Sequence, residues 1–398
     1  MIPRFKPWID RRELTVLLRR NSGAVERFER EFARRFQAAE AVAFPYGRSA
    51  LHAFFQAVGL RDAEIVMPAY TCSVVAHAIS LSGNVPRFVD IRLVDYNMDL
   101  DLLPEAINEK TRAIVATHLF GYPLDLDRVE RIVADAEARY GHKIWIVQDC
   151  AHSFGAEWKG RMVGTSGDAA LYALNISKMM TSIFGGMLTF QDKKLAGKAR
   201  EHRDRNFHMA PWYKPWLRRI YLAAATAAFN ETVYGLTWWL QEKTSLLNRL
   251  TKSYHLDEKI HFPPDAFDQM LDVEAAVGLE QLEKYPEIIA RRRATAKWYD
   301  ENLDRPERWE FPPIVEGATY SHYVVRVPDR KKAVAAMAAK GVHLGELIQY
   351  SVPELAGYVR ESNHFFRSKR TSMSTVNFPL TNQQNNLASR KVKKAIVL

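Results

Sequence analysis

The chain has 398 residues, of which 47% are hydrophobic and 26% are charged. This balance excludes a disordered or fibrous protein, and the length suits one large domain with a smaller one. The two cysteines, Cys72 and Cys150, lie far apart and form neither a zinc-binding spacing nor a disulfide framework. No metal site is expected. Residues 1–12 contain no apolar signal segment, so we expect a cytoplasmic location.

The net charge is +10, and it gathers in clusters such as Arg291–Arg293. A nucleic-acid-binding protein would interleave such clusters with aromatic residues and carry a known binding motif, and neither is present. We therefore expect no nucleic-acid partner. Most of these cations belong to solvated helix faces, and a smaller share serves phosphate-bearing substrates.

The first two thirds of the chain alternate helical and extended patterns. Apolar spacing predicts an amphipathic helix over Glu13–Phe36. Strands are predicted at Ala41–Phe44, Glu64–Met67, Pro86–Val89, Ala113–Thr117, Lys143–Val147, Ala169–Ala173 and Met187–Phe190. Helices are predicted between them at Ser49–Val58, Cys72–Leu81, Leu102–Asn108 and Leu126–Tyr140. This alternation indicates βαβ units and an α/β fold with a mostly parallel mixed sheet flanked by helices.

The C-terminal third predicts a smaller α+β unit. A long helix is expected over Asp272–Asn302, with Pro286 as a point where it can bend. A strand follows at His322–Pro328, with helices at Arg330–Lys340 and Asn386–Ala395. We therefore divide the chain into a large domain over residues 1–265 and a small domain over residues 266–398.

Residues 207–265 form an insertion that is dense in aromatic residues. Its apolar stretch Ile220–Phe229 has about half of the ~20 residues that a bilayer-spanning helix needs, so we reject a transmembrane helix. The pattern favours a buried helical hairpin or a subunit interface. Peripheral contact with a membrane through residues 212–239 stays open, with Arg218 and Arg219 at the edge.

Polar residues follow the strand that ends near Asp149. Ligands bind at the carboxyl ends of strands in open α/β sheets, and both Asp149 and His152 stand there. Taken alone, Asp149 is better explained as a helix N-cap. A lysine at 178 comes after the next strand and just before the Gly185–Gly186 turn, although most lysines are surface charges.

A third feature, a turn between a strand and a helix, favours a functional interpretation of Asp149 and Lys178. Gly47, Arg48 and Ser49 join a strand to a helix, and a helix N-terminus offers free N–H groups and a positive dipole to an anion. A phosphate-anchoring turn, an aspartate for a ring nitrogen and an amine nucleophile are the parts that a pyridoxal 5'-phosphate enzyme needs. Lys178 would form the Schiff base and transfer a proton, while Asp149 keeps the pyridine nitrogen protonated.

The order of these motifs resembles the DegT/DnrJ/StrS family of fold-type I sugar aminotransferases. The resemblance rests on Gly47-Arg-Ser-Ala-Leu, Met67-Pro-Ala-Tyr-Thr, Phe88-Val-Asp-Ile, Thr117-His-Leu-Phe-Gly, Asp149-Cys-Ala-His, Gly185-Gly-Met and Glu274-Ala-Ala-Val-Gly-Leu-Glu-Gln-Leu-Glu. It implies a homodimer with pyridoxal 5'-phosphate on Lys178. Asp149 would pair with the pyridine nitrogen, and His152 would lie near the ring's phenolic oxygen. The predicted phosphate contacts are Gly47, Arg48 and Ser49.

Some positions depart from the family pattern. The usual phosphate-binding serine is Ala173 here, and Ser177 is the candidate to replace it. The usual ring-stacking aromatic is Cys72, which we keep as a cofactor contact, with Tyr70 as a possible substitute. Phe267 and Gln269 stand where relatives carry an asparagine and an arginine that reach the neighbouring subunit. His118, His322 and Tyr70 are candidate substrate contacts, although a histidine at a strand end is more often structural.

The resemblance implies transfer of an amino group from an amino acid, usually glutamate, to a nucleotide-linked keto-sugar for glycan or secondary-metabolite biosynthesis. Relatives that act as sugar dehydratases replace the lysine by histidine, so Lys178 favours transamination. Two alternatives stay open. One is a pyridoxal lyase, a dehydratase or an aminotransferase on a non-nucleotide substrate. The other is a catalytically degenerate scaffold at a membrane surface.

Overall fold

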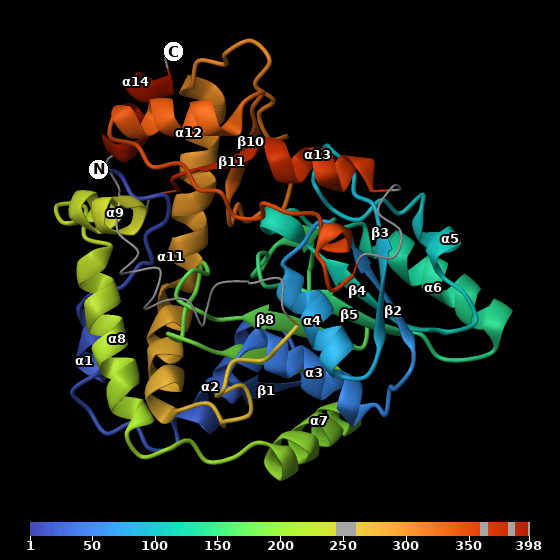
Figure 1. Ribbon diagram of the computed structural model, residues 1–398. Helices are drawn as coiled ribbons and strands as arrows, with labels where there is room; N and C mark the ends of the chain where they lie inside the picture. The colour runs from blue at the N-terminus through green and yellow to red at the C-terminus, as the bar shows by residue number, and fades with distance from the viewer. Residues whose placement is uncertain (244–259, 359–364, 381–386, 397–398) are drawn as a thin grey trace.

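The computed structural model describes residues 1–243, 260–358, 365–380 and 387–396. Within them, seven strands form one sheet in the order β1-β9-β8-β5-β4-β2-β3 (Figure 1). Their bounds are β1 Glu40–Phe44, β2 Glu64–Pro68, β3 Val85–Val89, β4 Thr111–Thr117, β5 Trp145–Asp149, β8 Ala169–Ala173 and β9 Gly186–Phe190. Only β9 runs antiparallel to its neighbours, β1 and β8. The predicted α/β fold with a mostly parallel mixed sheet is confirmed.

Helices cover both faces of the sheet. One face packs on α3 (Gly47–Ala57), α4 (Ser73–Leu81) and α7 (Lys193–Asn206), and the other on α2 (Ala24–Arg35), α5 (Leu103–Ala106), α6 (Leu126–Tyr140) and α11 (Asp272–Asn302). Along β4, Ala113 and Val115 point to the first face and Ile114 to the second. Since both faces are buried, these strands are apolar throughout, which is why they read as continuous apolar runs.

The predicted helix over Glu13–Phe36 is wrong. The structure has α1 over Arg11–Val16 and then α2, with a turn between them. Asp10 begins α1 through a capping box with Glu13, and Gly23 precedes α2 in the left-handed conformation with φ of 68°. A left-handed residue cannot continue a helix, so the apolar spacing runs across two separate helices.

The C-terminal elements lie above the sheet in Figure 1, joined to it by the long α11. They are the antiparallel pair β10 (Tyr323–Arg326) and β11 (Thr375–Phe378), with α12 (Arg330–Ala339), η3 (Val352–Glu354), α13 (Phe366–Ser374) and α14 (Leu387–Ile396). Of these elements, β10, β11, α12 and α14 share an apolar core that includes Val324, Met337 and Val392. Pro286 lies inside α11 without ending it. The domain boundary between residues 265 and 266 stays a prediction.

The aromatic insertion folds into α8 (Lys214–Ala228) and α9 (Tyr234–Lys243), and residues 244–259 lie outside the described ranges. A hairpin of helices is therefore present, but the prediction that it is buried is wrong for its outer face. Trp216, Leu217 and Ile220 on α8 are exposed. Within the described part of the chain, no helix is long and apolar enough to cross a membrane.

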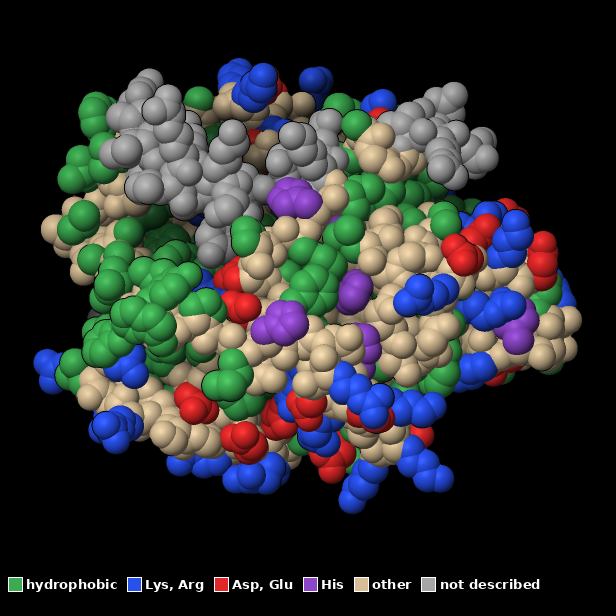
Figure 2. Space-filling view, turned by 60° about the horizontal axis from the view of Figure 1, so that its bottom comes forward, with side chains coloured by type: hydrophobic (Ala, Val, Ile, Leu, Met, Phe, Trp, Pro, Cys, Tyr) green, Lys and Arg blue, Asp and Glu red, His purple; other side chains and the backbone are tan. Residues whose placement is uncertain are grey.

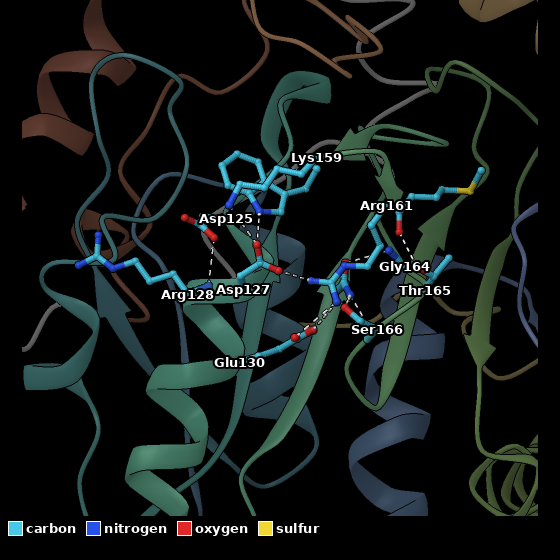
Figure 3. A network of polar contacts seen from close by, with 12 residues as sticks. Asp125, Asp127, Arg128, Glu130, Lys159, Arg161, Gly164, Thr165 and Ser166 are labelled. Atoms are coloured by element: carbon cyan, nitrogen blue, oxygen red, sulfur yellow. Dashed lines mark hydrogen bonds and ion pairs between the residues drawn. The ribbon is translucent and has the colours of Figure 1, made fainter.

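A polar network fastens a small hairpin, β6 (Glu157–Trp158) and β7 (Arg161–Met162), to the first turns of α6 (Figure 3). Arg161 pairs with Asp127 at 2.9 Å and with Glu130 at 3.5 Å. Exposed pairs of this kind add little stability, so their effect is mainly to fix position. Beyond the hairpin, the N–H of Gly164 donates to Oε1 of Gln148 at 2.8 Å, which holds the end of β5 in place.

Candidate active site

A cavity of about 260 Å³ opens at the carboxyl ends of the parallel strands. Asp149 ends β5 and stands beside Thr117, which ends β4, because the two residues pair in the strand register. The lining includes seven of the predicted cofactor residues: Gly47, Arg48, Cys72, Asp149, His152, Ser177 and Lys178. A larger hollow of about 680 Å³ beside β3 contains none of the predicted site residues. The smaller cavity is therefore the candidate active site.

The loop between β8 and β9 carries Lys178. Its ends are closed by a hydrogen bond from the N–H of Leu174 to the carbonyl of Gly185, at 2.9 Å. A side chain on Gly186 would place Cβ 2.4 Å from the Tyr46 carbonyl oxygen and 2.5 Å from the Gly47 nitrogen. Only glycine therefore lets β9 pass against the first turn of α3, which brings the lysine loop to the helix N-terminus.

Lys178 and Asp149 perturb one another within this cavity. Burial lowers the pKa of the Lys178 amine, against the opposing effect of the nearby Cys72 and Asp149 side chains. Burial also raises the pKa of Asp149, and the N–H of Ala151, which donates to Oδ1 at 3.0 Å, works in the opposite direction. A lowered lysine pKa makes the neutral, nucleophilic amine available nearer to neutral pH.

The first turn of α3 presents a positive helix end to the cavity. Gly47 is its first residue, no acidic side chain stands in this turn, and Tyr46 makes no side-chain cap. Arg48 also lines the cavity. Such a helix end attracts an anion through its N–H groups and its dipole. A Cβ on Gly47 would lie 3.0 Å from the Cβ of Ala173, so this glycine and this alanine are packed together.

The hydroxyl groups of the two serines that we predicted to bind phosphate form hydrogen bonds within the protein. Ser49 is fully buried, and its hydroxyl donates to the carbonyl of Ala266 at 2.7 Å instead of facing the cavity. Ser177 does line the cavity, but its hydroxyl donates to Oδ1 of Asn175 at 2.6 Å. The oxygen of Ser177 keeps only acceptor capacity in this arrangement, so it does not replace the missing serine at Ala173 as a donor.

His152 joins the cavity to a buried cluster of rings. Its ring stacks on Phe120 with centroids 5.9 Å apart and lies 5.1 Å from the ring of His322. Burial, Lys178 and His322 together hold the pKa of His152 well below its usual range. His322 does not line the cavity itself, but burial, Arg292 and Lys178 together hold its pKa well below the usual range. The neutral His152 ring accepts the Phe120 N–H at Nδ1, at 3.4 Å, which leaves Nε2–H as its donor.

Two predicted substrate contacts do not reach the cavity. His118 is fully buried, with Nε2 at 2.9 Å from Oε1 of Gln148 and Nδ1 accepting the N–H of Leu124 at 2.9 Å. Its ring nitrogens are satisfied by the core. Tyr70 is also fully buried, and its hydroxyl donates to the carbonyl of Ile348 at 3.2 Å. Tyr70 therefore does not take the place of a ring-stacking aromatic beside Cys72.

The positions that reach a neighbouring subunit in relatives are used within this chain. Phe267 packs its ring against Phe207 and His52. Gln269 donates its main-chain N–H to the carbonyl of His208 at 2.8 Å and its side-chain amide to the carbonyl of Phe207 at 3.4 Å. These contacts bind the end of the insertion to the strand-flanking helices.

The sequence interpretation missed several residues that line the cavity. Thr117 ends a parallel strand in register with Asp149, so its strand-end position was a signal that could have found it. Against the larger effect of burial, its buried hydroxyl lowers the pKa of the Asp149 carboxyl group. Leu347 and Ile348 come from the C-terminal part of the chain, and no local pattern marks them. Their presence shows that both parts of the chain build the cavity.

Comparison with known proteins identifies the family. Residues 18–225 and 265–396 match the sequence model of the DegT/DnrJ/EryC1/StrS aminotransferase family. The chain belongs to this family. The predicted resemblance is thus confirmed, and the unmatched residues 226–264 fall within the aromatic insertion.

Individual relatives are distant. GDP-perosamine synthase from Escherichia coli O157:H7 is 26% identical over 70% of this chain and 63% of its own length. The chain spans about three fifths of the length of the first curated relatives it matches. The solved sugar aminotransferase CalS13 from Micromonospora echinospora is 22% identical with a TM-score of 0.78, covering 100% of this chain and 99% of its own. Spr1654 from Streptococcus pneumoniae, solved in a PLP form, has 21% identity and a TM-score of 0.76, covering 99% and 97%.

The cavity suits a phosphorylated, ring-containing aldehyde. The end of α3 and Arg48 provide positive charge for a phosphate, and Lys178 provides an amine. Asp149 provides a buried carboxyl group for a ring nitrogen, with the buried hydroxyl of Thr117 beside it. Tyr46 and His152 are the ring-bearing residues of the lining. The donor set therefore fits pyridoxal 5'-phosphate.

Proposed function

We propose that this chain is a pyridoxal 5'-phosphate-dependent aminotransferase that moves an amino group from glutamate to a nucleotide-linked keto-sugar. The observation that supports it is the meeting of Lys178, Asp149 and the first turn of α3 in one cavity. Membership of the DegT/DnrJ/EryC1/StrS aminotransferase family bears out the cofactor and the class of reaction. The donor, the sugar and the nucleotide are parts of the proposal.

The cofactor, when bound, supplies an aldehyde carbon for an amine and a ring that accepts electrons. In our proposal the amide groups at Gly47 and Arg48 bind its phosphate. The carboxyl group of Asp149 holds a proton at the ring nitrogen. His152 orients the ring through Nε2–H. Lys178 is the catalytic residue, because its Nζ is the nucleophile and later accepts and returns the proton at the substrate carbon.

Charge in the cavity also favours anionic substrates. Arg48 and the α3 end contribute positive charge, and Asp149 is the one carboxyl group among the described lining residues. Glutamate and a nucleotide-linked sugar are both anions, so they are attracted to this field. Leu347 and Ile348 add an apolar wall from the C-terminal part, which excludes water from the reacting atoms.

A homodimer is part of the proposal, as the family resemblance implies. Because Phe267 and Gln269 are used within their own chain, a partner subunit would complete the cavity through other residues. The predicted cytoplasmic location likewise stays a prediction.

The test uses purified protein loaded with pyridoxal 5'-phosphate. We expect an absorption band from cofactor attached to Lys178, and conversion to the pyridoxamine form by glutamate alone. Lys178→Ala should lose both, while Lys193→Ala, an exposed lysine on α7, should keep both. A band that glutamate does not change would favour the lyase or dehydratase alternative. Wild-type protein that takes up no cofactor would contradict the proposal.

A further inference from the structure

Helix α8 is turned so that its apolar residues face outward. Its exposed positions carry Trp216, Leu217, Ile220, Ala223, Ala224 and Ala227. Trp216 is 61% exposed and Ile220 is 64% exposed. The buried positions are Lys214, Arg218 and Leu222, each four residues after the last. Two of these three buried residues are charged. This is the reverse of the usual surface helix, in which the apolar stripe faces the core.

Ion pairs hold α8 to the rest of the protein. Nζ of Lys214 lies 2.7 Å from Asp268 and 3.0 Å from Asp265. The guanidinium of Arg218 lies 2.8 Å from both Asp265 and Glu274, and it also covers the ring of Phe184 at 4.1 Å. These buried polar contacts fix the helix through its charged residues, and none of the described residues packs over Trp216, Leu217 or Ile220 closely enough to bury them.

Exposed apolar residues also stand along α9 and in the segment before α8. We define the outer apolar surface by its exposed residues Trp212, Tyr213, Trp216, Leu217, Ile220, Val233, Leu236 and Trp239. Figure 2 shows hydrophobic side chains gathered at the left of the molecule, on the side where Figure 1 places α8 and α9. A gathering of large exposed apolar side chains on one side of a globular protein (Figure 2) marks a docking site. Its α9 part lies in residues 226–264, which the family model does not match.

Arginines border the outer apolar surface. The guanidinium of Arg219 donates to the carbonyls of Leu17 at 2.6 Å and of Arg19 at 3.2 Å, so the α1–α2 turn lies against α8. This turn carries exposed Arg19 and Arg20 and the exposed side chain of Leu18. Within the described ranges, none of these three arginines forms an ion pair with a carboxylate, and α8 itself contains no acidic residue. The border is therefore positive.

We propose that the outer apolar surface docks the protein on an anionic lipid surface. Tryptophan and tyrosine are the residues that prefer the level of lipid headgroups, and four of the eight residues of this surface are of these types. An amphipathic helix with basic residues at its edge lies in the membrane interface and binds anionic lipids more strongly. A second copy of the chain is the weaker occupant, since it would bring an equally positive border against the first.

The experiment measures co-sedimentation of the cofactor-loaded protein with vesicles of phosphatidylcholine alone or with one quarter phosphatidylglycerol. We expect binding to the anionic vesicles that weakens as salt is raised. The combined variant Trp216→Ser, Ile220→Ser and Leu236→Ser should lower the partition coefficient at least about tenfold, because each side chain loses its apolar burial in the lipid. The control Ile314→Ser changes a still more exposed apolar residue outside this surface and should bind as the wild type does.

Two further measurements keep the proposal falsifiable. Sedimentation velocity without vesicles compares the wild type with the combined variant. A change from dimer to monomer would make the surface a subunit interface and overturn the proposal, as would a wild type that binds neither vesicle. Should the combined variant lose its cofactor absorption, Arg19→Gln with Arg20→Gln takes its place. That pair should weaken binding to the anionic vesicles severalfold, and unchanged binding would contradict the proposal.

Discussion

The hydroxyl of Ser49 donates a buried hydrogen bond to the main-chain carbonyl of Ala266 at 2.7 Å. The neighbouring hydroxyl of Tyr46 donates to Asp265 at 2.7 Å. The first turn of α3 therefore has two surfaces. Its N–H groups face the cavity, while its side chains fasten the segment that returns from the aromatic insertion. The hydroxyl of Ser49, which we predicted to bind phosphate, therefore bonds to the protein itself.

Removing this hydroxyl should affect stability more than cofactor binding. Ser49→Ala leaves the buried carbonyl of Ala266 without its donor, which costs about 1–2 kcal/mol of unfolding free energy. We expect cofactor affinity to change less than about twofold, since the hydroxyl does not enter the cavity. Urea unfolding and cofactor titration measure the two effects. A large loss of cofactor affinity at unchanged stability would show that the hydroxyl turns toward the phosphate.

Gly186→Ala should disrupt the lysine loop. Its Cβ would come within 2.5 Å of main-chain atoms of Tyr46 and Gly47, which cannot move without shifting the first turn of α3. We expect a loss of about 3 kcal/mol or more and weaker cofactor binding. Gly197→Ala on α7 is the matched control, because nothing lies within 4 Å of its added Cβ. A helical alanine there should stabilise the protein by about 0.5–1 kcal/mol. Thermal unfolding of both variants checks the contrast.

The stability of the cofactor-free protein should depend on pH through Asp149. Burial raises the pKa of this carboxyl group above its ordinary value of 3.8. The folded state therefore keeps a proton that the unfolded chain releases. The stability that this contributes is complete below pH 3.8 and is lost as pH rises through the folded pKa. The amide of Asp149→Asn has no such proton to release, so the variant should not lose this stability as pH rises. It should also have no turnover.

The melting temperatures of wild-type and Asp149→Asn protein, both without cofactor, check this between pH 4 and 8. Their difference should move in favour of the variant as pH rises. Asp135→Asn on α6 is the control for the same change of side chain, because Asp135 is exposed and does not line the cavity. A variant that becomes relatively less stable at high pH would contradict the expectation.

His118 should prove structural. His118→Leu leaves the N–H of Leu124 without an acceptor in the core, which costs about 2 kcal/mol. Burial lowers the pKa of His118 from 6.5 to about 4. The unfolded chain thus takes up a proton that the folded state refuses, and wild-type stability falls as pH drops from 6.5 toward about 4. The variant should lack this part of the pH dependence and keep the wild-type kcat when folded. A loss of kcat at full folding would place His118 in catalysis.

The sequence by itself determined the sheet and the chemistry of the site. Both faces of the central strands are buried, so their apolar runs stand out from the polar loops that follow, and the strand predictions agree with the structure. Parallel strands place their carboxyl ends at one edge, which is why Asp149 could be assigned to the site before its surroundings were known. Lys178 follows β8, which is parallel to β5, so its loop was assigned to the same edge of the sheet.

Only the tertiary structure decided which groups face the cavity. Whether the hydroxyl of Ser49 or the ring of His118 turns inward depends on partners as distant as Ala266 and Gln148, and sequence spacing carries no information on them. The same holds for α8. Its apolar residues suggested burial, but carboxylates of residues 265–274 pair with Lys214 and Arg218 and turn the other face outward. Ion pairs between distant segments set the orientation of a helix whose own sequence allows either face to be buried.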